Sequence, residues 1–123
     1  MADARDYTRE SANAMLPEIR RRLPVLREAF ETLQEHRQLM SDAVAGNGGN
    51  PRAGEYKAAT DAVAEQLGWF EQEGILVKDI GRGLIDFPSI REGREVLLCW
   101  MDGEDSVDFW HDLETGFAGR QPL

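Results

Sequence analysis

Nine positions between Leu16 and Val44 follow one another at alternating intervals of three and four residues. Eight of them are apolar and one is charged: Leu16, Ile19, Leu23, Leu26, Phe30, Leu33, Arg37, Met40 and Val44. This spacing places all nine on one narrow stripe of a helix, as in a coiled coil. The sequence therefore predicts a long first helix whose apolar stripe must be covered.

Local signals suggest how this helix begins. Thr8 is a suitable N-cap, and Glu10 places a carboxylate in the first turn. Pro17 fits the first turn of a helix, so a short turn and a break could precede the long helix. Pro24 removes one hydrogen bond and predicts a local bend.

A second apolar stripe predicts a helix over residues 54–73, formed by Tyr56, Ala59, Val63, Leu67 and Phe70. The glycine-rich segment 46–51 is a connecting loop, so the helices should pack as an antiparallel, coiled-coil-like hairpin over about 8–73. The first helix is longer, about 44 Å against about 30 Å. We expect the sheet or a second copy of the chain to cover the overhang, and therefore predict a homodimer.

The last third of the chain predicts a three-stranded antiparallel β-meander and a tail over about 75–123. The first strand spans 75–80; Gly81 and Gly83 break it, and 84–87 extends it or forms a second short piece. A turn is expected over 88–93, followed by a central strand at 94–101 that is apolar on both faces. The fold class is α+β, with one domain over residues 1–123.

Asp102-Gly103 is a strong signal for a two-residue hairpin turn leading into a last strand at 106–111. This turn would place Leu98 opposite Val107, Val96 opposite Phe109, and Arg94 opposite His111. The face toward the helices would then carry five apolar side chains: Val96, Leu98, Trp100, Val107 and Phe109. His111 would lie at the edge of that face, and Trp110 on the opposite face near Glu95 and Asp108. A slip of one residue would reverse these assignments.

The charge of the chain bears on its partners. The net charge is −9, and the segment 71–114 holds twelve acidic residues against four basic ones. Such a surplus disfavours nucleic acid and anionic membranes, and the basic run Arg20–Arg22 is interpreted as a solvated helix face. The polar start of the chain does not resemble a signal peptide, and no apolar run is long enough to span a membrane. With one cysteine, we expect a cytoplasmic protein.

Asp86 lies between Ile85 and Phe87, and a buried aspartate needs hydrogen-bond donors. Arg120 or Arg82 could pair with it and fix the tail onto the sheet. A sharper alternative is a small polar pocket formed by five residues: Asp86, Glu95, Trp110, His111 and Arg120. In that pocket Asp86 and His111 are the candidate catalytic residues, and Glu95, Trp110 and Arg120 the candidate ligand-binding ones.

Two further interpretations concern His111 and Cys99. His111, with Asp79, Asp86 and Glu95, could form a one-histidine metal site, but we favour a strand-end histidine that makes one hydrogen bond on a solvated acidic face. Because HExxH, paired histidines and CxxC are missing from the sequence, we predict no metal site and no cofactor. Cys99 lies mid-strand among apolar residues, so its thiol should be buried, with a raised pKa and little reactivity.

Several short motifs resemble a known family. They are Gly83–Pro88 (GLIDFP), Gly93–Val96 (GREV), Leu98–Trp100 (LCW), Phe109–His111 (FWH) and Gly116–Leu123 (GFAGRQPL), with Ala12–Pro17 (ANAMLP) near the start. The chain resembles an uncharacterised bacterial and archaeal family, domain of unknown function 2203, over essentially its whole length. The resemblance implies no activity and no residue role.

Two functional hypotheses follow, and the sequence leaves the function unknown. The first is a small interaction or scaffold protein that self-associates through its helical stripe or receives a helix of an unidentified protein partner. The second is a small enzyme or a ligand- or metal-binding protein with a polar site in its last third. We favour the first, because no known catalytic spacing is found.

Overall fold

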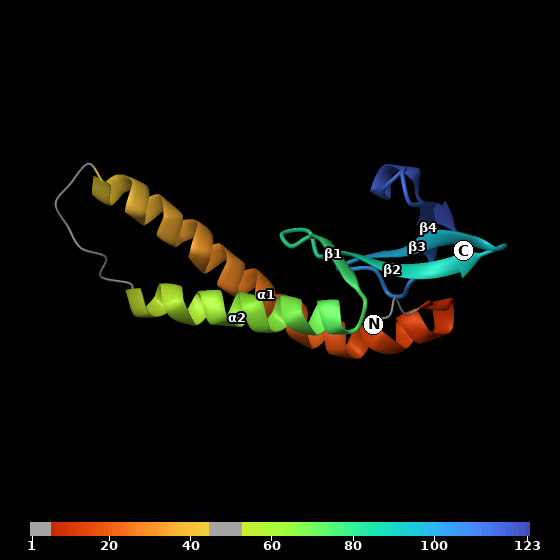
Figure 1. The fold of residues 1–123 in the computed structure, drawn as a ribbon, viewed down its shortest axis with the longest axis horizontal. Coiled ribbons are helices and arrows are strands. Elements are labelled where there is room, and N and C mark those ends of the chain that lie inside the picture. Colours follow the sequence, from red (N-terminus) through yellow and green to blue (C-terminus); the bar gives the residue numbers. More distant parts are fainter. Residues whose placement is uncertain (1–5, 45–52) are drawn as a thin grey trace.

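The computed structural model describes residues 6–44 and 53–123. Two helices, α1 (Arg9–Val44) and α2 (Ala53–Gln72), form an antiparallel pair (Figure 1). An antiparallel sheet in the order β1-β2-β3-β4-β5 follows, formed by Leu76–Asp79, Leu84–Arg91, Arg94–Met101, Phe109–Asp112 and Gln121–Pro122, with a short 3-10 helix η1 (Phe117–Gly119) before the last strand. The predicted α+β class is confirmed. The predicted number of strands, three, is wrong, because the sheet has five strands. The connecting loop expected over 46–51 lies outside the described residues.

Helix α1 is continuous over 36 residues, so the break expected near Pro17 is wrong. It begins as predicted at Thr8, whose Oγ1 accepts a hydrogen bond from the backbone N–H of Ser11 at 3.0 Å. Pro17 and Pro24 both lie inside the helix with exposed side chains. Each proline removes one backbone hydrogen bond, whereas the buried side chains of Leu16 and Leu23 beside them hold the helix on the core. None of the described helices is both long and apolar enough to cross a membrane.

The core lies between the first half of α1 and one face of the sheet, with α2 closing one end. Leu16, Ile19, Leu23 and Leu26 are at most 2% exposed. They pack against the helix-facing side chains of β2 and β3, which are Ile85, Phe87, Val96, Leu98 and Trp100, and against Phe70 of α2. The sheet therefore covers the first half of the predicted stripe. Farther along α1, Phe30 and Leu33 are half-buried and Arg37 is exposed.

Tyr7, just before α1, joins three parts of the fold. Its backbone N–H donates to the Pro88 carbonyl, its hydroxyl donates to the Glu73 carbonyl, and its own carbonyl accepts from the Ser89 hydroxyl. Its ring meets Phe87 edge to face, with centroids 5.2 Å apart. The start of α1 is thereby fixed to β2 and to the end of α2. Gly74 ends α2 in the left-handed region, at φ 73°, as predicted.

Strand β2 continues through the segment where a turn was expected. It runs past Pro88 to Arg91, which pairs with Arg94 of β3 across the two-residue turn Glu92-Gly93. Both turn residues have positive φ, 52° and 77°, as a tight β-hairpin of this kind requires. Pro88 is tolerated because β1 pairs only with the first part of β2, so no neighbouring strand needs its missing N–H.

The predicted pairing of β3 with the last strand is wrong. Cys99 pairs with Phe109, Leu98 with Trp110, and Leu97 with His111, an offset of three positions from the expected register. Because three is odd, the offset reverses the faces: Trp110 joins the helix-facing core, and Phe109 and His111 point away from it.

Glu104 explains why the connection between β3 and β4 is longer than the predicted two-residue turn. The chain does turn at Asp102-Gly103, where the Glu104 N–H donates to the Met101 carbonyl at 3.0 Å. However, the Met101 N–H donates to Oε1 of Glu104 at 2.8 Å, and the Trp100 indole N–H donates to the Glu104 carbonyl at 2.9 Å. Glu104 thus occupies the place of a strand residue, and β4 begins only at Phe109.

Candidate functional site

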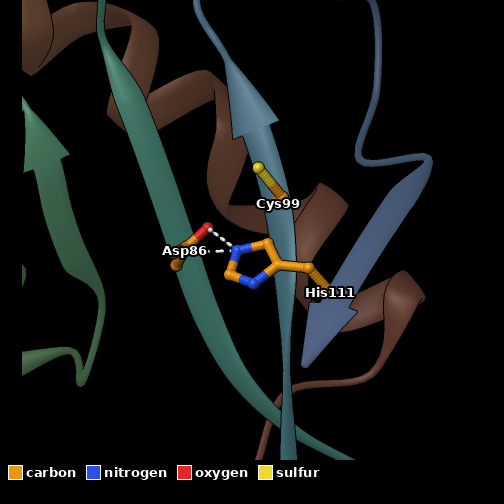
Figure 2. A group of neighbouring side chains, drawn as sticks. All are labelled: Asp86, Cys99 and His111. Atoms are coloured by element: carbon orange, nitrogen blue, oxygen red, sulfur yellow. Dashed lines mark hydrogen bonds and ion pairs between the residues drawn. The ribbon is translucent and has the colours of Figure 1, made fainter. Parts of the chain in front are cut away.

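A buried polar cluster lies on the face of the sheet opposite the helices. Asp86 of β2, Cys99 of β3 and His111 of β4 come from three adjacent strands and point toward one another (Figure 2). Asp86 and Cys99 are direct register partners. The side chains of all three are buried. We refer to these residues as the polar cluster.

The imidazole of His111 is held at both nitrogens. Its Nδ1 lies 2.8 Å from the Asp112 carbonyl, which accepts only, so Nδ1 carries a proton and donates it. Its Nε2 lies 3.2 Å from each carboxylate oxygen of Asp86. His111 is therefore the hydrogen-bond partner that the buried carboxylate of Asp86 requires.

The thiol of Cys99 completes the cluster. Burial, and next the negative charge of Asp86, raise the pKa of Cys99 to about 12, while Arg120 acts in the opposite direction. The predicted raised pKa is confirmed. One donor atom each from Asp86, Cys99 and His111 lies within 4.8 Å of the others.

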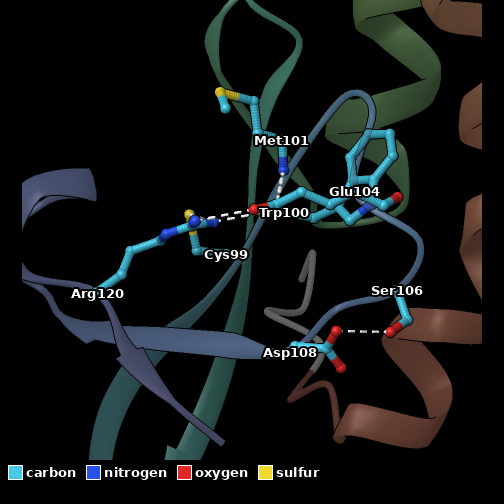
Figure 3. A network of polar contacts seen from close by, with 7 residues as sticks. All are labelled: Cys99, Trp100, Met101, Glu104, Ser106, Asp108 and Arg120. Atoms are coloured by element: carbon cyan, nitrogen blue, oxygen red, sulfur yellow. Dashed lines mark hydrogen bonds and ion pairs between the residues drawn. The ribbon is translucent and has the colours of Figure 1, made fainter.

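Arg120, in the tail between η1 and β5, lies beside the cluster. It donates to both carboxylate oxygens of Glu104, at 3.0 and 2.8 Å, and its Nη1 lies 3.9 Å from the Cys99 sulfur (Figure 3). Its guanidinium also lies 4.1 Å from the ring centroid of Phe109 and 4.3 Å from that of Phe117. Figure 1 places this tail on the other side of the sheet from the helices. The tail is therefore held over the Cys99 side of the cluster.

The expected ion pairs of Asp86 are corrected by these contacts. Arg120 pairs with Glu104, and Arg82 pairs with Asp79, so neither arginine neutralises Asp86. The physical reason is the register: Asp86 lies opposite Cys99 and next to the strand that carries His111.

Of the five residues expected to share one pocket, three lie at or beside the polar cluster and two lie elsewhere. Asp86 and His111 are in contact, and Arg120 reaches their neighbour Cys99. Glu95 is exposed and lines a separate shallow pocket with Arg94 and Asp112. Trp110 packs toward the helices, with the guanidinium of Arg91 at 4.8 Å from its ring centroid.

The sequence reasoning missed Cys99 as a member of the site. Its pairing with Asp86 follows from the Glu92-Gly93 turn, and the alternation of β2 and β3 then places both side chains on one face. A buried aspartate and histidine can share a proton. An oxygen, a sulfur and a nitrogen donor at this spacing can also bind a transition-metal ion.

A second feature is a groove between the two helices, away from the sheet. It has a volume of about 330 Å³ and is lined by Val25, Glu28, Ala29, Thr32, Glu55, Ala58, Ala59 and Ala62. Most of the lining is small and apolar. Figure 1 shows α1 and α2 diverging toward this end of the pair.

Comparison with known proteins gives one match. No curated protein and no solved structure matches this chain. A family model does match residues 5–123, which is nearly the whole chain, and its description is an uncharacterized conserved protein. The resemblance noted in the sequence motifs is thereby confirmed, and the chain belongs to the DUF2203 family.

Proposed function

We propose that this protein is a small interaction protein that self-associates through the far end of its helical pair. We call this end the distal hairpin, formed by residues 25–39 of α1 and residues 53–62 of α2. The proposed occupant of its groove is the distal hairpin of a second copy.

The proposal rests on apolar surface that the sheet does not cover. Within the distal hairpin, Val25 is 45% exposed, Tyr56 is 43% exposed and Leu39 is 37% exposed. The groove beside them is lined by four alanines. Exposed apolar side chains around an apolar groove are typical of a protein-binding surface.

A second copy suits this surface by shape and symmetry. Alanines allow another helix to approach closely, and the groove that they line lies between two helices that diverge (Figure 1). Two hairpins related by a two-fold axis would each offer the same groove and the same exposed side chains, giving a four-helix bundle. The heptad spacing that continues along α1 to Leu33 fits such packing.

The test compares two substitutions of the same type on the same helix. Ala58 is exposed and lines the groove, whereas Ala64 is exposed and does not line it. We expect the wild-type chain and Ala64→Glu to show twice the chain mass by light scattering after size exclusion. Ala58→Glu should show the monomer mass, because it would bury a charge in the interface.

Two results would overturn the proposal. One is a wild-type protein that stays monomeric across micromolar to submillimolar concentrations. The other is a dimer that Ala58→Glu leaves as stable as Ala64→Glu does. Circular dichroism of both variants separates a lost interface from a lost fold.

A further inference from the structure

We propose that Asp86, Cys99 and His111 form a binding site for one zinc ion. This site lies on the opposite face of the sheet from the helices and is independent of the proposed self-association. Three features of the polar cluster carry the inference: the spacing of its donor atoms, the orientation of its histidine, and its balance of charge.

The spacing is close to that of a tetrahedral site. Zinc bonds of about 2.0–2.3 Å place neighbouring donor atoms roughly 3.3–3.5 Å apart. The Asp86 oxygens and the His111 Nε2 are already 3.2 Å apart. All three donors lie within 4.8 Å of one another, so small side-chain rotations bring the Cys99 sulfur to bonding distance.

The orientation of His111 is that of a metal ligand. Metal-binding histidines usually donate a hydrogen bond from the nitrogen that does not bind the metal, and this bond fixes the tautomer and the ring. Here Nδ1 donates to the Asp112 carbonyl at 2.8 Å. The Nε2 atom therefore points at Asp86 and Cys99, where the ion would bind.

The charges of the cluster also favour a divalent cation. An aspartate, a thiolate and a neutral imidazole together carry two negative charges, which one zinc ion neutralises. Such a site is electrically neutral, as a fully buried position requires.

The surroundings fit a thiolate ligand. Arg120, 3.9 Å from the Cys99 sulfur, can donate to the thiolate while its own charge is balanced by Glu104. The mixed set of sulfur, nitrogen and oxygen donors selects zinc over Mg²⁺ or Ca²⁺, which prefer oxygen ligands only. Three protein ligands leave the fourth position of the ion to water or to an external ligand.

The first experiment uses the full chain, treated with a chelator and then titrated with Co²⁺ and with Zn²⁺. Co²⁺ should bind one per chain, with the visible absorption of a four-coordinate ion and a thiolate-to-cobalt charge-transfer band. Since the chain has one cysteine, this band reports ligation by Cys99 alone. Zn²⁺ should displace Co²⁺ and abolish both signals.

Variants then assign the other two ligands. Asp86→Asn and His111→Gln should weaken zinc binding by at least about 100-fold, measured by competition with a chromophoric chelator. His36→Gln, which changes the other histidine, on α1, should leave zinc affinity within twofold of wild type. Circular dichroism reports whether each variant is folded.

Several results of these experiments would overturn the zinc proposal. Cobalt binding without a charge-transfer band, or zinc affinity unchanged in folded Asp86→Asn, would show metal bound to surface carboxylates and would overturn the proposal. No binding of either ion to the wild-type chain would overturn it as well. If Asp86→Asn and His111→Gln do not fold, the wild-type spectrum and its loss in Cys99→Ser still decide the matter.

Discussion

Arg120 of the C-terminal tail and Glu104 of the β3–β4 connection form a two-pronged ion pair, with hydrogen bonds of 3.0 and 2.8 Å. The two side chains are only 15% and 23% exposed, so solvent screens the pair weakly. Glu104 also accepts the Met101 N–H. This single carboxylate therefore sets the course of the chain after β3 and ties the tail to it.

A double-mutant cycle with Glu104→Gln and Arg120→Gln should give a coupling energy of about 1–3 kcal/mol, because the pair is charge-assisted and largely buried. Urea unfolding of the four proteins measures it. The same cycle on the exposed pair Lys57–Asp61, at 79% and 67% exposure, should give at most about 0.5 kcal/mol. Equal coupling in the two cycles would contradict the structural role given to Glu104.

Leu23 tests the contact between α1 and the sheet. Its side chain is 1% exposed within the core, so Leu23→Ala should destabilise the fold by about 2–5 kcal/mol. Leu113→Ala changes the same residue type at 55% exposure and should stay within about 0.5 kcal/mol of wild type. Denaturant unfolding compares the two, and similar losses would mean that this face of α1 is not packed as described.

Gly83 should not tolerate a side chain. Its φ is +65°, and an added Cβ would lie 2.6 Å from Asp102 Cβ and 2.8 Å from Arg27 Nη2. Gly83→Ala should therefore lower stability by about 1–3 kcal/mol. Gly68→Ala, in the middle of α2 with open space around it, should raise stability by about 0.5–1 kcal/mol. Thermal unfolding shows whether the two changes have opposite signs.

Cys99 should be unreactive in the folded, metal-free protein. The thiol is fully buried, and its pKa is raised to about 12, so almost no thiolate is present near neutral pH. Iodoacetamide in the presence of a chelator should leave the native chain unmodified but add one group in guanidinium chloride, as seen by mass spectrometry. Rapid alkylation of the native protein would contradict the burial of this residue.

Asp108 should give the fold a small acid-sensitive contribution. A hydrogen bond from the Ser106 hydroxyl, and then one from Arg9, hold the pKa of this carboxyl below its usual value of 3.8. Because the pKa is lower in the folded state, the stabilisation is present above pH 3.8 and disappears as the pH falls through the folded-state pKa.

The matching experiment is Asp108→Asn, followed by urea unfolding from neutral to acid pH. The variant should be less stable at neutral pH by no more than about 1 kcal/mol, since the ion pair with Arg9 is exposed. The difference should close at acid pH. Asp105→Asn, in the same loop, controls for the loss of one negative charge. A difference that persists at low pH would assign the effect to packing.

The sequence was a good guide where local patterns decide the structure. The stripe from Leu16 to Leu26 predicted the buried face of α1, and Thr8 and Gly74 predicted helix ends. The central strand at 94–101 matches β3. These features depend on side-chain periodicity and capping, which a sequence displays directly.

Pairing across the sheet was harder to predict, because it depends on contacts that no local rule contains. Asp102-Gly103 is a stronger hairpin signal than Glu92-Gly93, yet only the second forms a two-residue connection between strands. The backbone and side chain of Glu104 bind Trp100 and Met101 and shift the next strand. The shifted register places His111 beside Asp86. The polar cluster could therefore not be predicted without knowing this shift.

The placement of α1 has a consequence for synthesis of the chain. The side of α1 that carries Leu16 and Leu23 is covered by β2 and β3, which are translated more than sixty residues later. While the sheet is still being synthesised, the apolar face of this helix lacks the cover that β2 and β3 provide in the folded protein. We therefore expect the nascent chain to attract chaperones until β3 has emerged, after which the core can close in one cooperative step.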